Sequence, residues 1–158
     1  MTAKLIDGKK FAKEIEDELQ VRVAHMTIPP KLSVVQVGED PASTSYIRAK
    51  SNAADRIGIS LTHHHLSSDI SKKELETLVK NLNKTEDGII VQLPLPAGFE
   101  SVLDLIEPEN DVDGFHPTNL GKIVQENSGM RPCTPAGIIE LLSRTGNDPS
   151  GKNVVVVG

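Results

Sequence analysis

The chain of 158 residues has few aromatic side chains and almost no cysteine. It contains no tryptophan, three phenylalanines and one tyrosine, so the position of that tyrosine, Tyr46, is unusually informative. The single cysteine, Cys133, excludes an internal disulfide and fits a reducing compartment. No pattern of Cys or His surrounds Cys133, and we expect a structural thiol rather than a nucleophile.

Basic clusters and long apolar stretches are also missing. The 17 Lys and Arg residues are outnumbered by 22 Asp and Glu, and the net charge of −5 argues against a nucleic-acid or anionic-membrane partner. No stretch approaches the length of a membrane span, and the first residues hold no apolar core of a secretory signal. We therefore expect a cytoplasmic protein that binds neither nucleic acid nor a membrane.

Helix-like and strand-like segments alternate along the chain. Asp40 and Pro41 are typical of a helix start and Gly58 of a helix end, and Ser71 with Glu74 forms a capping-box pair. Helices are predicted at 9–26, 41–57 and 71–82, around 102–106, and from 134 onward; strands are predicted at 32–37, 59–66, 88–93 and 153–157. This order indicates an α/β fold, a three-layer αβα domain with a mostly parallel sheet.

Four consecutive valines, Val154 to Val157, lead directly into Gly158. A buried strand that ends in glycine is how nucleotide-binding βαβ units begin, because the glycine opens the phosphate-binding turn. We interpret these residues as the first strand of a Rossmann-type domain, and the chain as truncated there.

The segment Ser-Thr-Ser-Tyr-Ile-Arg-Ala-Lys places Tyr46 and Lys50 four residues apart on the predicted helix. Such residues lie above one another on the same face, and small or apolar residues continue this stripe through Ile57. A lysine on a packing face, beside a phenol, is suited to act as an acid or base. The alternative is a lysine whose stem covers the core while its charge reaches the surface.

Further candidates follow the predicted strands at their carboxyl ends, where parallel sheets bind ligands. Gln92 interrupts an apolar strand and is either functional or satisfied by local backbone. The Asp111 and Asp113 pair lacks the other ligands of a calcium loop, so we expect no metal site there. The consecutive residues 63–65 are histidines whose side chains alternate between faces and therefore cannot converge on one ion, and His116 is interpreted as structural.

Four segments, in this order, resemble the methylenetetrahydrofolate dehydrogenase/cyclohydrolase family of the bacterial bifunctional type. The resemblance extends from Leu5 to the end of the chain and is specific because all four segments occur together. They are Val-Gly-Glu-Asp-Pro-Ala-Ser-Thr-Ser-Tyr-Ile-Arg-Ala-Lys (37–50), Asp-Gly-Ile-Ile-Val-Gln-Leu-Pro-Leu-Pro (87–96), Pro-Glu-Asn-Asp-Val-Asp-Gly-Phe-His-Pro-Thr-Asn-Leu-Gly (108–121) and Arg-Pro-Cys-Thr-Pro-Ala-Gly (131–137).

The resemblance implies a folate site and a role for each matching residue. Lys50 is expected to be the catalytic acid or base, Gln92 to hold this lysine, Tyr46 to stack on the aminobenzoate ring, and Asp113 to bind the pterin. The folate slot is expected to be lined by Val91, Leu93 and Pro94. The implied reactions are NADP-dependent oxidation of 5,10-methylenetetrahydrofolate to the methenyl form and its hydrolysis to 10-formyltetrahydrofolate.

The resemblance also implies two domains: a folate-binding catalytic domain at 1–120, then an interdomain helix segment and the start of an NADP-binding domain at 121–158. Thr134 and Gly158 are the residues expected to contact NADP, and most of that site is expected beyond the chain. The complete protein is expected to be a homodimer, whereas this chain is expected to be a monomer without dehydrogenase activity.

Two alternatives remain open. One is a folate-binding module without turnover. The other is a short-chain dehydrogenase, which also uses Tyr-x-x-x-Lys; only 45 residues precede Tyr46, however, and they lack the glycine-rich nucleotide turn of that class.

Overall fold

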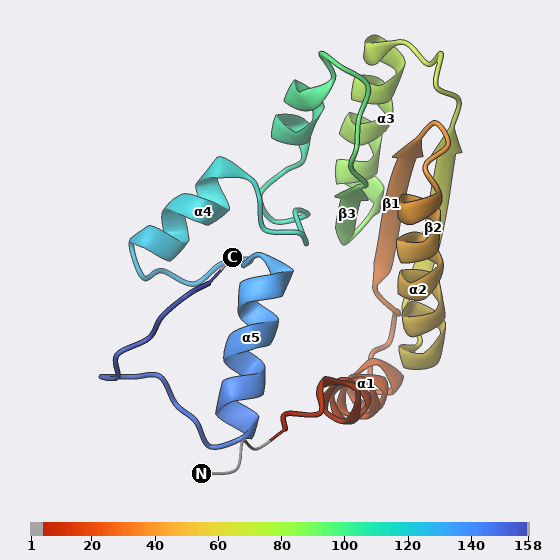
Figure 1. The fold of residues 1–158 in the computed structure, drawn as a ribbon. Helices are drawn as coiled ribbons and strands as arrows, with labels where there is room; N and C mark the ends of the chain where they lie inside the picture. Colours follow the sequence, from red (N-terminus) through yellow and green to blue (C-terminus); the bar gives the residue numbers. More distant parts are fainter. Residues whose placement is uncertain (1–4, 158) are drawn as a thin grey trace.

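The computed structural model describes residues 5–157 (Figure 1). The helices are α1 (Gly8–Ala24), α2 (Pro41–Ile57), α3 (Lys72–Thr85), the 3₁₀ helix η1 (Glu100–Leu105), α4 (Pro117–Val124) and α5 (Cys133–Arg144), and the strands are β1 (Lys31–Val37), β2 (Ser60–Leu66) and β3 (Gly88–Val91). Within this described part, no helix has both the length and the apolar character needed to cross a membrane.

The three strands form a wholly parallel sheet in the order β2-β1-β3, which confirms the predicted α/β class. Each face of the sheet carries its own apolar cluster. Val34 and Ile90 meet Ile47 of α2 on one face, whereas Val35 and Ile89 on the other face belong to the larger cluster formed with α3 and η1. Helices therefore cover both faces, and this is the three-layer arrangement expected from the sequence.

The predicted end signals of two helices are confirmed. The Asp40 carboxylate accepts a hydrogen bond of 2.7 Å from the Ser43 amide at the start of α2, and Gly58 ends this helix with φ of 86°. Ser71 and Glu74 form a reciprocal capping box at the start of α3. These local interactions fix where α2 begins, and hence which of its residues face the sheet.

Other segments differ from the sequence-based expectation, most clearly β3, η1 and α4. β3 ends at Val91 rather than Leu93, although the backbone N–H of Gln92 still donates to the Val35 carbonyl at 2.8 Å. The helix expected at 102–106 is a 3₁₀ helix. Helix α4 was not predicted; its N-cap is His116, whose Nδ1 accepts from the Thr118 amide at 3.1 Å.

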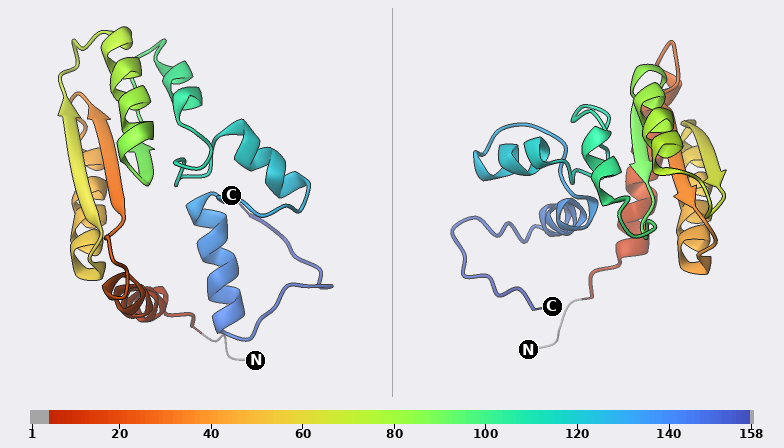
Figure 2. Two further views of the ribbon diagram at one scale, coloured as in Figure 1. Left: turned by 180° about the vertical axis from the view of Figure 1, so that it is seen from behind. Right: turned by 90° about the horizontal axis from the view of Figure 1, so that it is seen from above.

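The strand predicted at 153–157 was wrong: these residues form no strand in the structure. Val154 to Val157 are exposed and follow the loop that extends away from the sheet after α5 (Figure 2). A strand exists only when a neighbour satisfies its amides and carbonyls, and no strand within residues 5–157 lies beside this segment. The Rossmann-type strand inferred from the valine run is therefore absent from the described structure.

Candidate functional site

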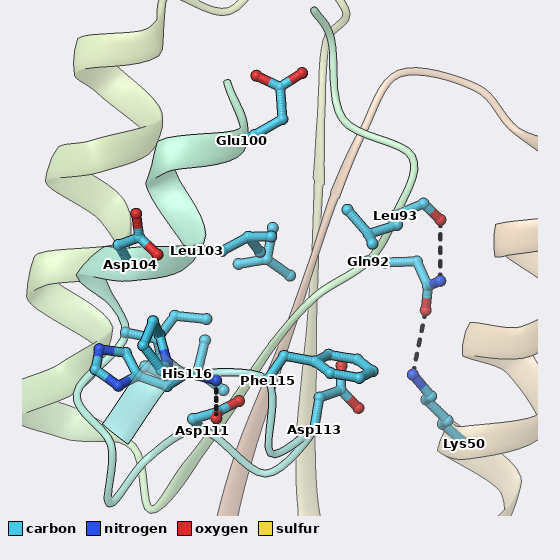
Figure 3. A pocket seen from close by; sticks show the side chains of 14 residues that line it. Lys50, Gln92, Leu93, Glu100, Leu103, Asp104, Asp111, Asp113, Phe115 and His116 are labelled. Carbon is cyan, nitrogen blue, oxygen red and sulfur yellow. Dashed lines mark hydrogen bonds between the residues drawn. The ribbon is translucent and has the colours of Figure 1, made fainter. Parts of the chain in front are cut away.

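A pocket of about 250 Å³ lies at the carboxyl end of β3, between α2, η1 and the loop that follows η1 (Figure 3). Side chains from all of these elements line it. They include Lys50 from α2, Val91, Gln92 and Leu93 from the end of β3, and Asp113 and Phe115 from the loop before α4. This is the edge of a parallel sheet at which ligand sites form.

Lys50 lies on the stripe of α2 that packs against the sheet. The buried residues of this helix are Ser43, Ile47 and Ala54, and Lys50 continues their spacing, half-buried, between the last two. Its Nζ donates to Gln92 Oε1 at 3.2 Å, across 42 residues of sequence. The packing of α2 therefore directs this ammonium at the end of β3.

The amide of Gln92 has a defined orientation. Its Nε2 donates to the Leu93 carbonyl at 3.1 Å, which leaves Oε1 directed at Lys50. The same carbonyl accepts a hydrogen bond of 2.9 Å from Ser43 Oγ, and the Leu93–Pro94 peptide bond that follows is cis. Gln92 is thus bound to local backbone, as one of the two interpretations expected, and its remaining side-chain oxygen accepts a hydrogen bond from the lysine.

Asp113 is half-buried and lines the same pocket. Loss of water around its carboxyl raises its pKa; the nearby charge of Lys50 lowers this pKa in part, and the charge of Asp111 raises it further. An acidic and a basic side chain therefore line the same pocket.

Asp111 has a different role from Asp113, although the two lie in one Asp-x-Asp pair. Its side chain is 4% exposed and accepts hydrogen bonds from the Gly114 amide (3.1 Å), the His116 amide (2.8 Å) and Asn119 Nδ2 (3.0 Å). These oxygens are therefore occupied by the protein itself. Among residues 5–157 no group of three or more His, Cys, Asp or Glu is arranged to hold a metal ion.

The three histidines of β2 alternate as the strand geometry requires. His64 contacts Ser33 at 3.1 Å, whereas the rings of His63 and His65 stack on the same face with their centroids 5.5 Å apart. His63 Nε2 contacts Gln36 Oε1 at 3.1 Å. Burial, and then the neighbouring His65 and His64, lower the pKa of His63.

Three of the described residues proposed from sequence, Tyr46, Pro94 and Thr134, do not line this pocket. Tyr46 is 66% exposed, because α2 turns the stripe of Ser43 and Ile47 toward the sheet and leaves the phenol at the flank. Pro94 and Thr134 are also exposed, the latter in the first turn of α5, and Gly158 lies outside the described residues.

Several lining residues were not proposed as site residues from the sequence: Glu100, Leu103 and Asp104 of η1, Phe115 of the loop before α4, and His116, which was interpreted as structural. No local motif marks the three residues of η1, because their place in the pocket depends on how η1 packs against α3. The Asn-Asp-Val-Asp-Gly-Phe-His motif was the only signal for Phe115 and His116.

Cys133 lies beside this site rather than in it. Its Sγ is 3.7 Å from the Val112 carbonyl. Partial loss of water, followed by the charge of Asp113, raises the pKa of the thiol. Both effects disfavour the thiolate, which agrees with the structural role expected for this residue.

Comparison with known proteins identifies the family. Residues 6–113 match the family model of the tetrahydrofolate dehydrogenase/cyclohydrolase catalytic domain. The bifunctional protein FolD of Bacillus pumilus is 46% identical over 165 aligned positions, which cover 100% of this chain and 58% of that protein.

Two solved structures share the fold. The bifunctional FolD of Campylobacter jejuni superposes with a TM-score of 0.88 at 37% identity, covering 92% of this chain and 54% of the other. The Trypanosoma brucei methylenetetrahydrofolate dehydrogenase-cyclohydrolase, solved with NADP cofactor and an inhibitor, gives a TM-score of 0.85 at 34% identity, covering 92% and 53%. The chain thus spans a little over half the length of these relatives. The motif-based resemblance is confirmed, and the chain belongs to the tetrahydrofolate dehydrogenase/cyclohydrolase family, of which it contains the catalytic domain.

Proposed function

We propose that this chain is the folate-binding part of an enzyme of one-carbon metabolism, which oxidises 5,10-methylenetetrahydrofolate and hydrolyses the 5,10-methenyl product to 10-formyltetrahydrofolate. Family membership and the names of the relatives support the reaction class. The observation that carries the residue assignment is the 3.2 Å contact between Lys50 Nζ and Gln92 Oε1, in a pocket that also holds Asp113.

The hydrolysis needs three proton transfers, two of which one group can perform in turn. Water adds to the methenyl carbon and loses a proton, and N5 takes up a proton as its bond to that carbon breaks. The hydroxyl left on the carbon then releases its proton to the solvent and becomes the formyl oxygen. Overall one proton is released. Lys50 is the proposed carrier between the water and N5, and Gln92 accepts a hydrogen bond from it to hold Nζ in place. Acid–base assistance of this kind contributes about 10² to 10⁴ in rate.

The remaining site residues are proposed to bind and orient the folate. Asp113 accepts hydrogen bonds from the pterin, and Val91 with Leu93 forms an apolar wall. Tyr46 and Pro94 are exposed at the flank of the pocket, where they are free to contact the aminobenzoate portion of a bound folate. Such contacts contribute through orientation of the reacting carbon rather than through chemistry of their own.

NADP is the cofactor proposed for the oxidation, as in the Trypanosoma brucei relative. Residues 5–157 show no glycine turn between a paired strand and a helix of the kind that binds a dinucleotide. Thr134 is exposed, and Val154 to Val157 provide neither a paired strand nor a glycine turn that opens a helix within the described residues. NADP, when bound, would accept the hydride. The domain division near residue 120 and the homodimer of the complete protein remain part of this proposal.

The test is hydrolysis of 5,10-methenyltetrahydrofolate by the chain and by Lys50→Met, with binding of the folate measured in parallel. Lys80→Met is a matched control, since Lys80 is exposed on α3 and lies outside the pocket. We expect Lys50→Met to lose at least about 10²-fold in rate while binding survives, and Lys80→Met to behave as the unchanged chain. Turnover retained by Lys50→Met would overturn the role of the lysine, and a chain that binds no folate would overturn the proposed function.

A further inference from the structure

The carboxylate of Asp113 has no hydrogen-bond partner within residues 5–157, so its position depends on the backbone that carries it. That backbone is the segment 111–116, named here the aspartate loop. On its β3 side the loop is joined to the sheet, because the Ile89 amide donates to the Asn110 carbonyl at 2.8 Å and Ile89 forms a parallel bridge with Asp111.

Asp111 holds the aspartate loop together from inside. Its Oδ1 accepts from the Gly114 amide and its Oδ2 from the His116 amide, which lie on the two sides of Phe115. Asp113 lies between Asp111 and the first of these donors, so the carboxylate closes the loop around it. A buried carboxylate with several donors forms strong, charge-assisted hydrogen bonds. This one fixes the curvature of the loop at the wall of the pocket (Figure 3).

Asn119, on α4, connects this carboxylate to the rest of the fold. It is 1% exposed, and its Nδ2 donates both to Asp111 Oδ2 at 3.0 Å and to the Pro108 carbonyl at 2.8 Å. Both acceptors determine the orientation of the amide, and its Oδ1 has no partner among the described residues. An unpaired buried acceptor costs stability, so the protein retains this amide at an energetic disadvantage.

We infer that Asp111 and Asn119 are positioning residues for substrate binding: together they place the Asp113 carboxylate in the pocket. This inference rests on the proposed function, in which Asp113 binds the pterin. Neither residue touches Lys50 or Gln92, so their effect is on affinity for the folate rather than on the proton transfers.

The variants Asn119→Ala and Asp111→Asn test this pairing, and Asn83→Ala is the matched control. Asn83 is also a loop-holding amide: it donates to the Leu105 carbonyl at 2.7 Å and accepts from the Glu107 amide at 3.0 Å, outside the pocket. Asn119→Ala removes an unpaired acceptor along with two hydrogen bonds, and we therefore expect it to fold.

Three measurements are made on each variant. Calorimetric titration with tetrahydrofolate gives the dissociation constant, which we expect to rise by about tenfold or more in both loop variants and by less than about twofold in Asn83→Ala. Saturating 5,10-methenyltetrahydrofolate gives kcat, which we expect to stay within about threefold of the unchanged chain. Hydrogen exchange is followed as well, and the amides of Asp113 and Gly114 are expected to exchange faster in the loop variants while those of α3 do not.

Unchanged affinity in both loop variants, or an equal loss in Asn83→Ala, would overturn the inference. A loss confined to kcat would do the same, because it would place the two residues in the chemistry. If the unchanged chain itself bound no tetrahydrofolate, the proposed function would fail, and the exchange of the Asp113 and Gly114 amides would still decide whether the pair holds the loop.

Discussion

The hydroxyl of Ser43 donates a hydrogen bond of 2.9 Å to the carbonyl of Leu93, which lies 50 residues further along the chain. The Gln92 side chain donates to this same oxygen at 3.1 Å. This partly buried hydrogen bond joins the first turn of α2 to the segment after β3, whose Gln92 side chain contacts Lys50. The proposed catalytic pair, Lys50 and Gln92, comes from α2 and from the segment after β3. The hydrogen bond of Ser43 holds these two segments together.

Ser43→Ala is expected to destabilise the chain and to slow hydrolysis. The substitution leaves the Leu93 carbonyl with the Gln92 amide alone, and the lost hydrogen bond costs about 1 kcal/mol of unfolding free energy. The Leu93 carbonyl, which orients the Gln92 side chain, is then held less firmly. The hydrolysis rate should therefore fall although no reacting group is changed. Urea unfolding and the hydrolysis rate measure the two effects. Ser45→Ala, an exposed neighbour on the same helix, should change neither.

Gly114→Ala is expected to be far more damaging than Gly98→Ala, although both glycines have positive φ (71° and 85°). A Cβ at Gly114 would lie 2.5 Å from the Arg131 carbonyl carbon and 2.7 Å from the Pro132 nitrogen, whereas a Cβ at Gly98 would meet nothing within 4 Å. Gly98→Ala therefore reports the backbone strain alone, about 1 kcal/mol or more. Gly114→Ala adds a clash between two backbone segments, and thermal unfolding should show a clearly lower midpoint. Equal losses in the two variants would contradict this close approach.

Asp113→Asn is expected to change the pH dependence of stability. Burial raises the pKa of Asp113 in the folded chain above the ordinary value of about 3.9. The folded state thus binds this proton more tightly than the unfolded state does, and the associated stability is present below about pH 4 and lost as the pH rises through the raised pKa. The variant should therefore gain stability relative to the unchanged chain as the pH increases, with the two converging in acid.

Urea unfolding across this pH range checks the sign. Asp55→Asn, at an exposed position of α2, serves as the control. A difference between Asp113→Asn and the unchanged chain that does not vary with pH would show that the carboxyl titrates alike in the folded and unfolded states.

Local signals in the sequence were enough for most of the fold. Asp40 caps the start of α2 by accepting from the Ser43 amide, Pro41 occupies its first position, and Gly58 ends it by donating to the Ala54 carbonyl. The capping box of Ser71 and Glu74 fixes the start of α3 in the same local way. The apolar stretches of β1 and β3 predicted buried parallel strands because helices cover both faces of such a sheet. Helix α4 was not predicted from the sequence because its N-cap is His116, a residue type with no strong preference for that position.

The sequence by itself indicated that Gln92 lies at the carboxyl end of a strand and that Lys50 lies on the packing face of a helix, and the family resemblance assigned both to one site with Asp113. Only the tertiary structure decided that Tyr46 lies at the flank of the pocket while Lys50 points into it, since the rotation of α2 is set by packing of Ser43 and Ile47. The tertiary structure also gave Asp111 and Asp113 different roles, although they are identical side chains two positions apart. Asp111 accepts hydrogen bonds from three donors of the protein, whereas Asp113 is directed at the pocket. Spacing reports local geometry, whereas the partners of a buried polar group come from distant segments and are fixed only when those segments pack.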